Sequence, residues 1–312
     1  MSRHGKFHLE SRSQVTAWRP GPGGAQVRLR WLDTTGLLAL ALREVTAPAR
    51  LQTRNSVKKH DEIAEASPTI TANRDQIFVD KKSATRDFKF DTQTAGVFDD
   101  MVDRSVPLYG EIQRMCCELA ADFALDGTNL VDLGCATGTT LALLDPAVSP
   151  GVQFVGIDNS PAMLEQARKK LVRGGIKRSY RLVEADIDRT AVFENASVAL
   201  MILTLQFVRP LYRESVMQRL FDGMLPNSAL ILVEKLTVKD GVLNRLFIEH
   251  YYEMKRRNGY SEIEIANKRE ALENVLIPYR WEENEELLKR SGFRHVEIFF
   301  RWYNFVGAIA LK

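Results

Sequence analysis

Cysteine and histidine are scarce in this chain of 312 residues, and their placement excludes several classes of protein. Of the three cysteines, Cys116 and Cys117 are adjacent and Cys135 stands alone. An odd count with this spacing predicts neither a disulfide framework nor a zinc site. The five histidines show no metal-ligand spacing either. We therefore expect a cytoplasmic protein that binds no metal.

Long apolar runs are missing as well. The best candidate for a membrane segment, residues 36–42, is far too short to cross a bilayer. It also lies behind a polar stretch that contains Pro20 and Pro22, which an ordinary signal peptide does not have. The sequence therefore predicts no membrane partner.

Positive charge is concentrated near the start of the chain, although the net charge is only +3. Residues 1–60 contain 11 Lys/Arg and 3 Asp/Glu, so the remainder is mildly acidic. A basic arm can contact nucleic acid or an anionic membrane. The lack of sustained periodicity favours instead a poorly ordered extension over residues 1–75. Because the remaining domain, 76–312, lacks a broad basic face, we expect no direct binding of nucleic acid.

The strongest signal lies in residues 129–140, with the sequence Asn-Leu-Val-Asp-Leu-Gly-Cys-Ala-Thr-Gly-Thr-Thr. A short apolar run bounded by a turn predicts a buried strand of a parallel sheet. The loop that follows contains Gly134 and Gly138, which suit a tight turn that a ligand approaches closely. A second apolar run, 154–157, ends in Asp158. An acid at that position is placed to hold two ribose hydroxyls.

The glycine spacing excludes the commonest nucleotide sites. The chain has no G-x-G-x-x-G at this loop, and it lacks the lysine and Ser/Thr of a phosphate-binding loop. A nucleoside without a pyrophosphate fits better, and S-adenosylmethionine is the commonest such ligand. The alternative is a glycine-containing turn in an unrelated α/β protein. Asp158, together with Asp186 after the third strand, where an acid commonly binds an exocyclic amine, favours S-adenosylmethionine.

Alternating strands and helices define the fold class. Apolar runs at 180–183, 198–203 and 229–234 continue the parallel sheet, and the last two, 295–300 and 305–311, form a closing hairpin. This order predicts the α/β class I methyltransferase (Rossmann-like) sheet, with helices on both faces and a C-terminal antiparallel hairpin. Helices before the first strand can cover the ligand edge of the sheet, where Tyr109 is a candidate contact.

The residues at the strand ends do not indicate which kind of molecule would accept a methyl group. There is no Asn/Asp-Pro-Pro-Tyr/Phe motif for amine methylation and no cysteine near the fourth or fifth strand. Those strand ends offer Thr204, Gln206 and Glu234, and none of them is an evident general base. The catalytic residues therefore stay unknown at this level.

A charged helical insertion at about 243–275 is the second informative segment. An aromatic and basic helix ends at Asn258, and Ser261 with Glu264 forms the capping pattern of a second helix. Charge alone favours a solvated, salt-bridged surface. The alternative is that an arginine of this segment recognises a carboxylate.

Six motifs occur together in this chain. They are Arg-Ser-Val-Pro at 104–107, Asp-Leu-Gly-Cys at 132–135, Ile-Asp-Asn-Ser-Pro-Ala-Met at 157–163, Thr-Leu-Gln-Phe at 204–207, Asn-Gly-Tyr-Ser at 258–261 and Lys-Arg-x-x-Leu-Glu-Asn-Val at 268–275. From about Ile77 to its end, the chain closely resembles the carboxy-S-adenosyl-L-methionine synthase family. The first-strand motif is common to many methyltransferases, whereas the combination with the last two motifs is specific.

The resemblance implies an activity. The family converts S-adenosylmethionine and prephenate into carboxy-S-adenosylmethionine and phenylpyruvate. Prephenate loses CO2 as it becomes aromatic, and the sulfonium methyl, once deprotonated, captures that carbon. The product is the carboxymethyl donor for a separate enzyme that modifies wobble uridine in tRNA, so the resemblance implies functional coupling to that tRNA carboxymethyltransferase. A protein with this role mainly orients its substrates and closes the site.

The resemblance also implies the site residues. Carried over by position, those that contact S-adenosylmethionine or its carboxylated form are Tyr109, Gly134, Cys135, Ala136, Asp158, Asn159, Asp186 and Ile187. Arg269 pairs with the added carboxylate, reaching across a homodimer interface. Ile202 departs from the family, which has an asparagine there; Thr204 could substitute for the lost polar contact. Two other functions stay open: a conventional small-molecule methyltransferase, and a non-catalytic carrier of carboxy-S-adenosylmethionine.

Overall fold

The computed structural model describes residues 74–79 and 87–312, all of which belong to one compact unit, 66–312. The predicted N-terminal extension, 1–75, lies outside the described residues except for Arg74 and Asp75. None of the described helices is long and apolar enough to cross a membrane.

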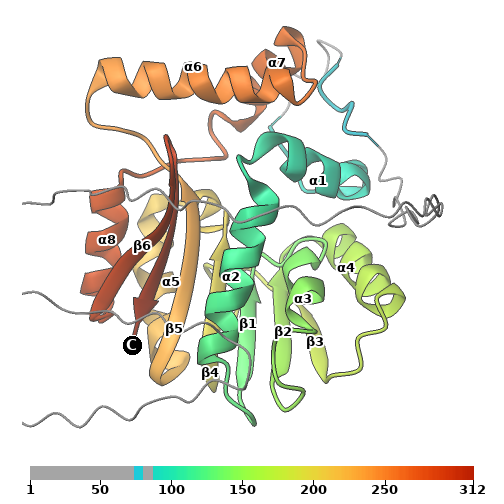
Figure 1. Ribbon diagram of the computed structural model, residues 1–312, viewed down its shortest axis with the longest axis vertical. Helices are drawn as coiled ribbons and strands as arrows, with labels where there is room; N and C mark the ends of the chain where they lie inside the picture. Colours follow the sequence, from blue (N-terminus) through green and yellow to red (C-terminus); the bar gives the residue numbers. More distant parts are fainter. Residues whose placement is uncertain (1–73, 80–86) are drawn as a thin grey trace, which may run out of the picture. The chain divides into compact units, whose positions relative to one another are not determined.

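A seven-stranded sheet forms the centre of the protein, with the strand order β3-β2-β1-β4-β5-β7-β6 (Figure 1). The strands are β1 (Asn129–Leu133), β2 (Gln153–Asp158), β3 (Tyr180–Glu184), β4 (Ala196–Ile202), β5 (Met224–Lys235), β6 (His295–Trp302) and β7 (Phe305–Leu311). Strands β1 to β5 are parallel, and β7 pairs antiparallel with both β5 and β6. This is the predicted class I methyltransferase sheet with its closing hairpin.

Helices cover both faces and one edge of this sheet. They are α1 (Thr92–Ser105), α2 (Tyr109–Phe123), α3 (Thr139–Leu144), α4 (Pro161–Arg173), α5 (Pro210–Gly223), α6 (Gly241–Arg257), α7 (Glu262–Leu272) and α8 (Trp281–Arg290). Local sequence sets their starts. Ser160 caps α4 by accepting from the N–H of Met163, with Pro161 at the first helical position. Ser261 and Glu264 form the predicted capping box of α7.

Alternate side chains of the central strands separate two apolar clusters. Leu130 of β1 points to the face that α2, α3 and α4 cover, whereas Val131 and Leu133 point to the face covered by α5 and α8. All three side chains are almost fully buried. A strand buried on both faces reads as a continuous apolar run, which is why the sequence revealed it. Asp132 is the exception within that run.

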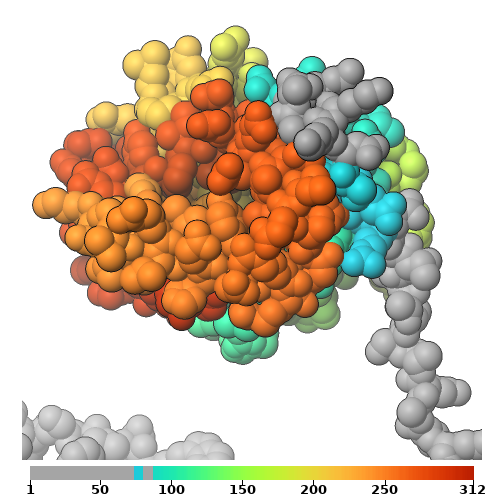
Figure 2. All heavy atoms as spheres, turned by 90° about the horizontal axis from the view of Figure 1, so that it is seen from above, coloured from blue at the N-terminus to red at the C-terminus, as the bar shows by residue number. Residues whose placement is uncertain are grey.

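Three helices, α1, α6 and α7, lie above the carboxyl edge of the parallel strands (Figure 1). Helices α6 and α7 occupy the stretch in which the sequence predicts a helical insertion. Seen from that end, these two helices form much of the surface of the protein (Figure 2). They and α1 therefore enclose the region in which ligands of open α/β sheets bind.

Candidate functional site

A cavity of about 440 Å³ lies at the carboxyl edge of the sheet, beneath the covering helices. This volume is within the range of small-molecule sites. The cavity brings together most of the predicted site residues: Tyr109, Gly134, Cys135, Ala136, Asp158, Asn159, Asp186, Ile187 and Ile202. Arg269 is different, because it is exposed on α7 and does not line the cavity of its own chain.

The turn between β1 and α3 requires its glycines. Gly134 has φ +74°, and a Cβ added there would lie 2.5 Å from Oγ1 of Thr204. Its N–H donates to the carbonyl of Ile157, which ties the turn to β2. Gly138 has φ +73°, and an added Cβ would lie 3.1 Å from Cβ of Ala167. A side chain at Gly134 would thus collide with Thr204, which follows β4, and it would also strain the backbone.

Asp158 is fixed at the tip of β2 by two backbone donors. Oδ2 accepts from the N–H of Ala136 at 3.0 Å, and Oδ1 accepts from the N–H of Ser160 at 2.9 Å. Burial raises the pKa of this carboxyl group, and the backbone donors oppose the shift. Each carboxylate oxygen retains a further acceptor position. The geometry therefore suits the acceptance of two hydroxyl donors from a ribose.

Asp132 is the strongest sign that the cavity takes a cationic group. It lines the cavity from β1 and is 2% exposed, and its Oδ2 has no hydrogen-bond partner among the described residues. Burial, together with repulsion from Asp158, raises its pKa to about 7. A buried acceptor without a donor calls for one from a ligand. The ammonium of the methionine part of S-adenosylmethionine supplies such donors, so these residues fit that ligand.

The loop after β3 supplies further acids. Asp186 and Ile187 line the cavity as expected, and Asp188 lines it beside them. Oδ1 of Asp188 is buried and has no partner among the described residues. Burial and the neighbouring Asp186 raise the pKa of Asp188. This part of the cavity is thus rich in acceptors, which suits an exocyclic amine.

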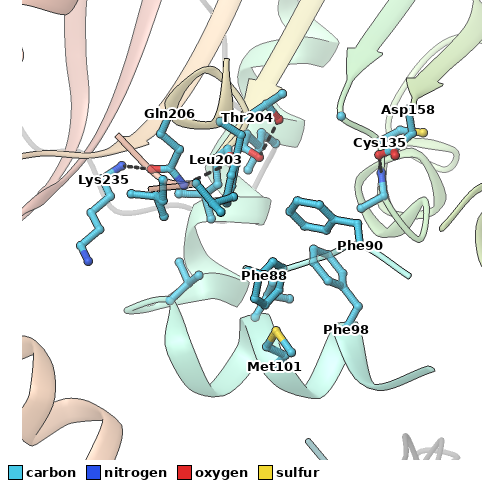
Figure 3. A pocket seen from close by; sticks show the side chains of 18 of the residues that line it. Phe88, Phe90, Phe98, Met101, Cys135, Asp158, Leu203, Thr204, Gln206 and Lys235 are labelled. Atoms are coloured by element: carbon cyan, nitrogen blue, oxygen red, sulfur yellow. Dashed lines mark hydrogen bonds between the residues drawn. The ribbon is translucent and has the colours of Figure 1, made fainter. Parts of the chain in front are cut away.

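Polar side chains also line the cavity just after the end of β4. The hydroxyl of Thr204 donates to the carbonyl of Ile202 at 3.3 Å. Gln206 donates to the carbonyl of Leu203, and its Oε1 accepts from the N–H of Lys235 at 3.0 Å (Figure 3). The side chain of Ile202 itself is apolar, and the hydroxyl nearest to it in the chain belongs to Thr204.

Glu234 takes no part in the cavity lining, although the sequence places it at a strand end. It is 2% exposed and accepts from the N–H of Leu205 at 2.9 Å. Burial raises its pKa to about 8, against the opposing effect of Arg213. Glu234 therefore anchors the β4 turn, and it offers no base to the reacting atoms.

Aromatic side chains from the covering segment close the cavity. Phe88, Phe90, Phe98 and Met101 face the strand ends across it (Figure 3). The segment is anchored to the glycine turn, because Asp99 accepts from Thr137 Oγ1 at 2.6 Å and from Lys170 Nζ at 2.7 Å. Apolar walls exclude water, which strengthens the electrostatic contacts inside.

Two lysines line the cavity that sequence reasoning did not assign to the site. Lys235 is the last residue of β5, and Lys268 belongs to α7. Lys235 and Asp158 lie on opposite sides of the cavity (Figure 3). Lys268 is 5% exposed, whereas its neighbour Arg269 is exposed. The sequence showed only a basic helix and did not indicate which residue points inward.

A fold with this strand order and a nucleoside-sized cavity at its carboxyl edge defines a class I methyltransferase-like protein. Residues 130–227 match the family model of the methyltransferase domain. An O-methyltransferase family protein from Burkholderia thailandensis has the same fold, with a TM-score of 0.50 and 16% identity. That alignment covers 71% of this chain and 60% of the other.

Closer relatives identify the family. A carboxy-S-adenosyl-L-methionine synthase from Methylococcus capsulatus is 53% identical over 241 residues, which are 77% of this chain and 100% of the relative. A synthase of the same name from Wolinella succinogenes is 44% identical over 245 residues, 77% of this chain and 98% of the relative. The chain belongs to the carboxy-S-adenosyl-L-methionine synthase family, as the six sequence motifs indicated.

Within residues 74–79 and 87–312, no group of three or more His, Cys, Asp or Glu side chains is arranged to hold a metal ion. The charged side chains that line the cavity are the carboxylates of Asp132, Asp158, Asp186 and Asp188 and the cationic groups of Arg209, Lys235 and Lys268. Such an arrangement binds and orients charged organic molecules.

Proposed function

We propose that this protein synthesises carboxy-S-adenosyl-L-methionine from S-adenosyl-L-methionine and prephenate, with release of phenylpyruvate. The observation that carries the proposal is the match to the whole length of the Methylococcus capsulatus synthase. The cavity supports it, because its acceptors Asp132 and Asp158 fit a cationic nucleoside. S-adenosylmethionine is here a substrate, and the product retains its adenosyl and methionine parts.

The reaction balances without an oxidant or a reductant. The methyl carbon loses one proton and forms a bond to the carboxyl carbon that leaves the prephenate ring. The ring also loses its hydroxyl group as it becomes aromatic, and this hydroxide combines with the proton to give water. No base from the protein is required if the two substrates are bound in the correct relative orientation. The protein's task is orientation and exclusion of water, to which the aromatic wall of Phe88, Phe90 and Phe98 contributes.

Arg269 is proposed to pair with the added carboxylate from the partner subunit of a homodimer. Its exposed position on α7, away from the cavity of its own chain, supports a role in a second chain. Helix α6 supports an interface on the same covering layer, because Val242, Leu243 and Leu246 in its first turns are 58%, 46% and 48% exposed. Neighbouring exposed apolar side chains commonly mark a protein contact. The product would then serve the enzyme that carboxymethylates wobble uridine in tRNA.

Isotope transfer tests the proposed reaction. Purified protein is incubated with S-adenosylmethionine and prephenate that carries ¹³C in its ring carboxyl group, and the products are analysed by mass spectrometry. We expect labelled carboxy-S-adenosylmethionine and unlabelled phenylpyruvate. Carboxy-S-adenosylmethionine released from denatured protein without any turnover would identify a carrier. Formation of S-adenosylhomocysteine that is indifferent to prephenate would identify a conventional methyltransferase.

Replacement of Arg269 tests the carboxylate contact. We expect Arg269→Ala to abolish retention of carboxy-S-adenosylmethionine through purification and to change the affinity for S-adenosylmethionine less than threefold. The reason is that a charge-assisted pair, worth about 1.5–3 kcal/mol, involves only the added carboxylate. Arg257→Ala is the matched control, since Arg257 is also an exposed helical arginine. Equal loss of both ligands, measured by calorimetry, would contradict the assignment.

A further inference from the structure

We propose that Lys235, which packs against Tyr251, and Lys268 bind the carboxylate that the second substrate keeps through the reaction. We call these three residues the lysine end of the cavity. This inference rests on the proposed function and specifies its second substrate as an aromatic 2-oxo acid or its direct precursor. Prephenate carries two carboxylates; one is transferred, and the other remains on phenylpyruvate.

Lys235 is an ammonium group that lacks an anion. It lines the cavity from the end of β5, where its backbone N–H donates to Oε1 of Gln206. Its Nζ lies 4.6 Å from the centre of the Tyr251 ring and has no hydrogen bond or ion pair with any described residue. Buried charges in proteins are normally paired. An anion that enters the cavity would complete this site.

Lys268 presents a second ammonium from α7. Its Nζ donates to Ser105 Oγ at 3.0 Å and lies 3.6 Å from Asp75 Oδ2. Asp75 is shared, because it also accepts from the hydroxyl of Tyr260 at 2.9 Å. Lys268 is 5% exposed and still lines the cavity. It is thus held in place by the protein while part of its hydrogen-bonding capacity faces the ligand space.

A third buried lysine lies beside this end of the cavity. Lys255 of α6 packs against the same tyrosines, with Nζ 5.6 Å from the Tyr251 ring centre and 5.0 Å from that of Tyr260. Burial lowers the pKa of Lys235 and of Lys268 to about 8, and that of Lys255 to about 6. Lys255 does not line the cavity. It therefore provides a buried lysine of the same cluster that carries little charge at neutral pH.

The position of the lysine end favours the second substrate over S-adenosylmethionine. The acceptors suited to the ribose and the ammonium, Asp158 and Asp132, lie toward β1 and β2, and Lys235 lies on the opposite side (Figure 3). The methionine carboxylate is the competing occupant, and binding measurements distinguish the two. The aromatic ring of Tyr251 beside Lys235 also suits a substrate whose six-membered ring lies two carbons from the bound carboxylate.

Phenylpyruvate binding to protein saturated with S-adenosylhomocysteine tests the inference without turnover. We expect Lys235→Met to weaken phenylpyruvate at least tenfold at pH 7.5 and Lys235→Arg to keep its affinity within threefold. Lys255→Met, the matched control, should change it less than twofold. Phenylacetone, in which a methyl group replaces the carboxylate, should bind wild type and Lys235→Met equally. Thermal unfolding of each variant shows that the fold is retained.

Three outcomes would overturn the inference. They are unchanged phenylpyruvate affinity in Lys235→Met, no binding of phenylpyruvate by wild type, and an equal loss of S-adenosylhomocysteine affinity, which would assign Lys235 to the methionine carboxylate. Lys268→Met, which leaves the hydrogen bonds of Asp75 with Tyr260 and with the N–H of Ile77 in place, should give a loss similar to that of Lys235→Met. The proposed function fails separately, if wild type binds phenylpyruvate through Lys235 but forms no carboxy-S-adenosylmethionine from prephenate.

Discussion

The two ends of the cavity are built in different ways. The nucleoside end, formed by Asp132, Gly134 and Asp158, comes from one strand-helix-strand unit and is fixed by backbone hydrogen bonds. The lysine end joins β5, α6 and α7, and the hydrogen bond that holds Lys268 connects it to a residue 163 positions away. A local unit can be read from its motif, whereas an assembly of distant segments becomes visible only in the folded protein.

The two ends also differ in charge. Carboxylates with raised pKa values gather at the nucleoside end, where Asp132 and Asp188 each have a buried oxygen without a partner among the described residues. Ammonium groups with lowered pKa values gather at the lysine end. In both cases burial disfavours the charged form, and a ligand of opposite charge would restore it. The cavity is therefore matched to one cationic and one anionic substrate.

Removal of the Asp158 carboxylate should have the largest effect, and it should be confined to the nucleoside end. We expect Asp158→Ala to weaken S-adenosylmethionine and its carboxylated form alike by about a hundredfold or more, since each charge-assisted hydrogen bond contributes about 1.5–3 kcal/mol. Calorimetry measures both affinities. Asp186→Ala, with a single expected contact, should cost about tenfold. Unchanged affinity in Asp158→Ala would refute the ribose assignment.

A methyl group at Gly134 should have a smaller effect, on both stability and binding. Gly134→Ala combines a strained φ with a Cβ 2.5 Å from Thr204 Oγ1. We expect a loss of about 2–3 kcal/mol in the free energy of unfolding. The double variant Gly134→Ala/Thr204→Ala should recover the steric part and leave about 1 kcal/mol of backbone strain. Urea denaturation measures the difference, and a double variant no more stable than the single one would exclude the contact with Thr204.

The nucleoside end and the fold could be predicted from sequence because their determinants are local. Continuous apolar runs revealed the strands, and Gly134, Gly138 and Asp158 lie at fixed distances from them. Asp132 belongs to the same motif, but the sequence did not predict its role. The signal was an acid within a run that is buried on both faces, which requires a partner for its charge.

The lysine end could not be predicted because sequence does not give the orientation of a basic helix. Lys268 and Arg269 are adjacent, and only packing decides that Lys268 faces Ser105 while Arg269 faces outward. Lys235 directly follows the apolar run 229–234, and no sequence motif marked it as a site residue. Its importance depends on Tyr251, which reaches it from another element. Arg269 was predicted from the resemblance to a family, whereas the two lysines were identified from the geometry of the cavity.

The smallest expected effect is on the pH dependence of binding. The affinity for one ligand should fall at acid pH and that for the other at alkaline pH, so the two ends can be compared directly. With a pKa of about 7, Asp132 is charged above that pH, so affinity for the cationic S-adenosylmethionine should fall about tenfold per pH unit below it. Lys235 and Lys268, with pKa values of about 8, are charged below that pH, so affinity for phenylpyruvate should fall as pH rises above it. The titratable or charged groups that surround these lysines are Asp75, Asp100, Arg104, Tyr251, Lys255, Tyr260 and Glu264.

Variants separate the two limits. Asp132→Asn should flatten the acid limit of S-adenosylmethionine binding and leave the alkaline limit of phenylpyruvate binding in place. Lys235→Arg should reduce the alkaline limit alone, because a guanidinium keeps its proton throughout this range. Burial raises the pKa of Tyr251 and Tyr260 beyond the same range, so they add no step to it. Parallel rather than opposite pH dependence of the two ligands would show that both substrates depend on one set of groups, and the division of the cavity into two ends would then be wrong.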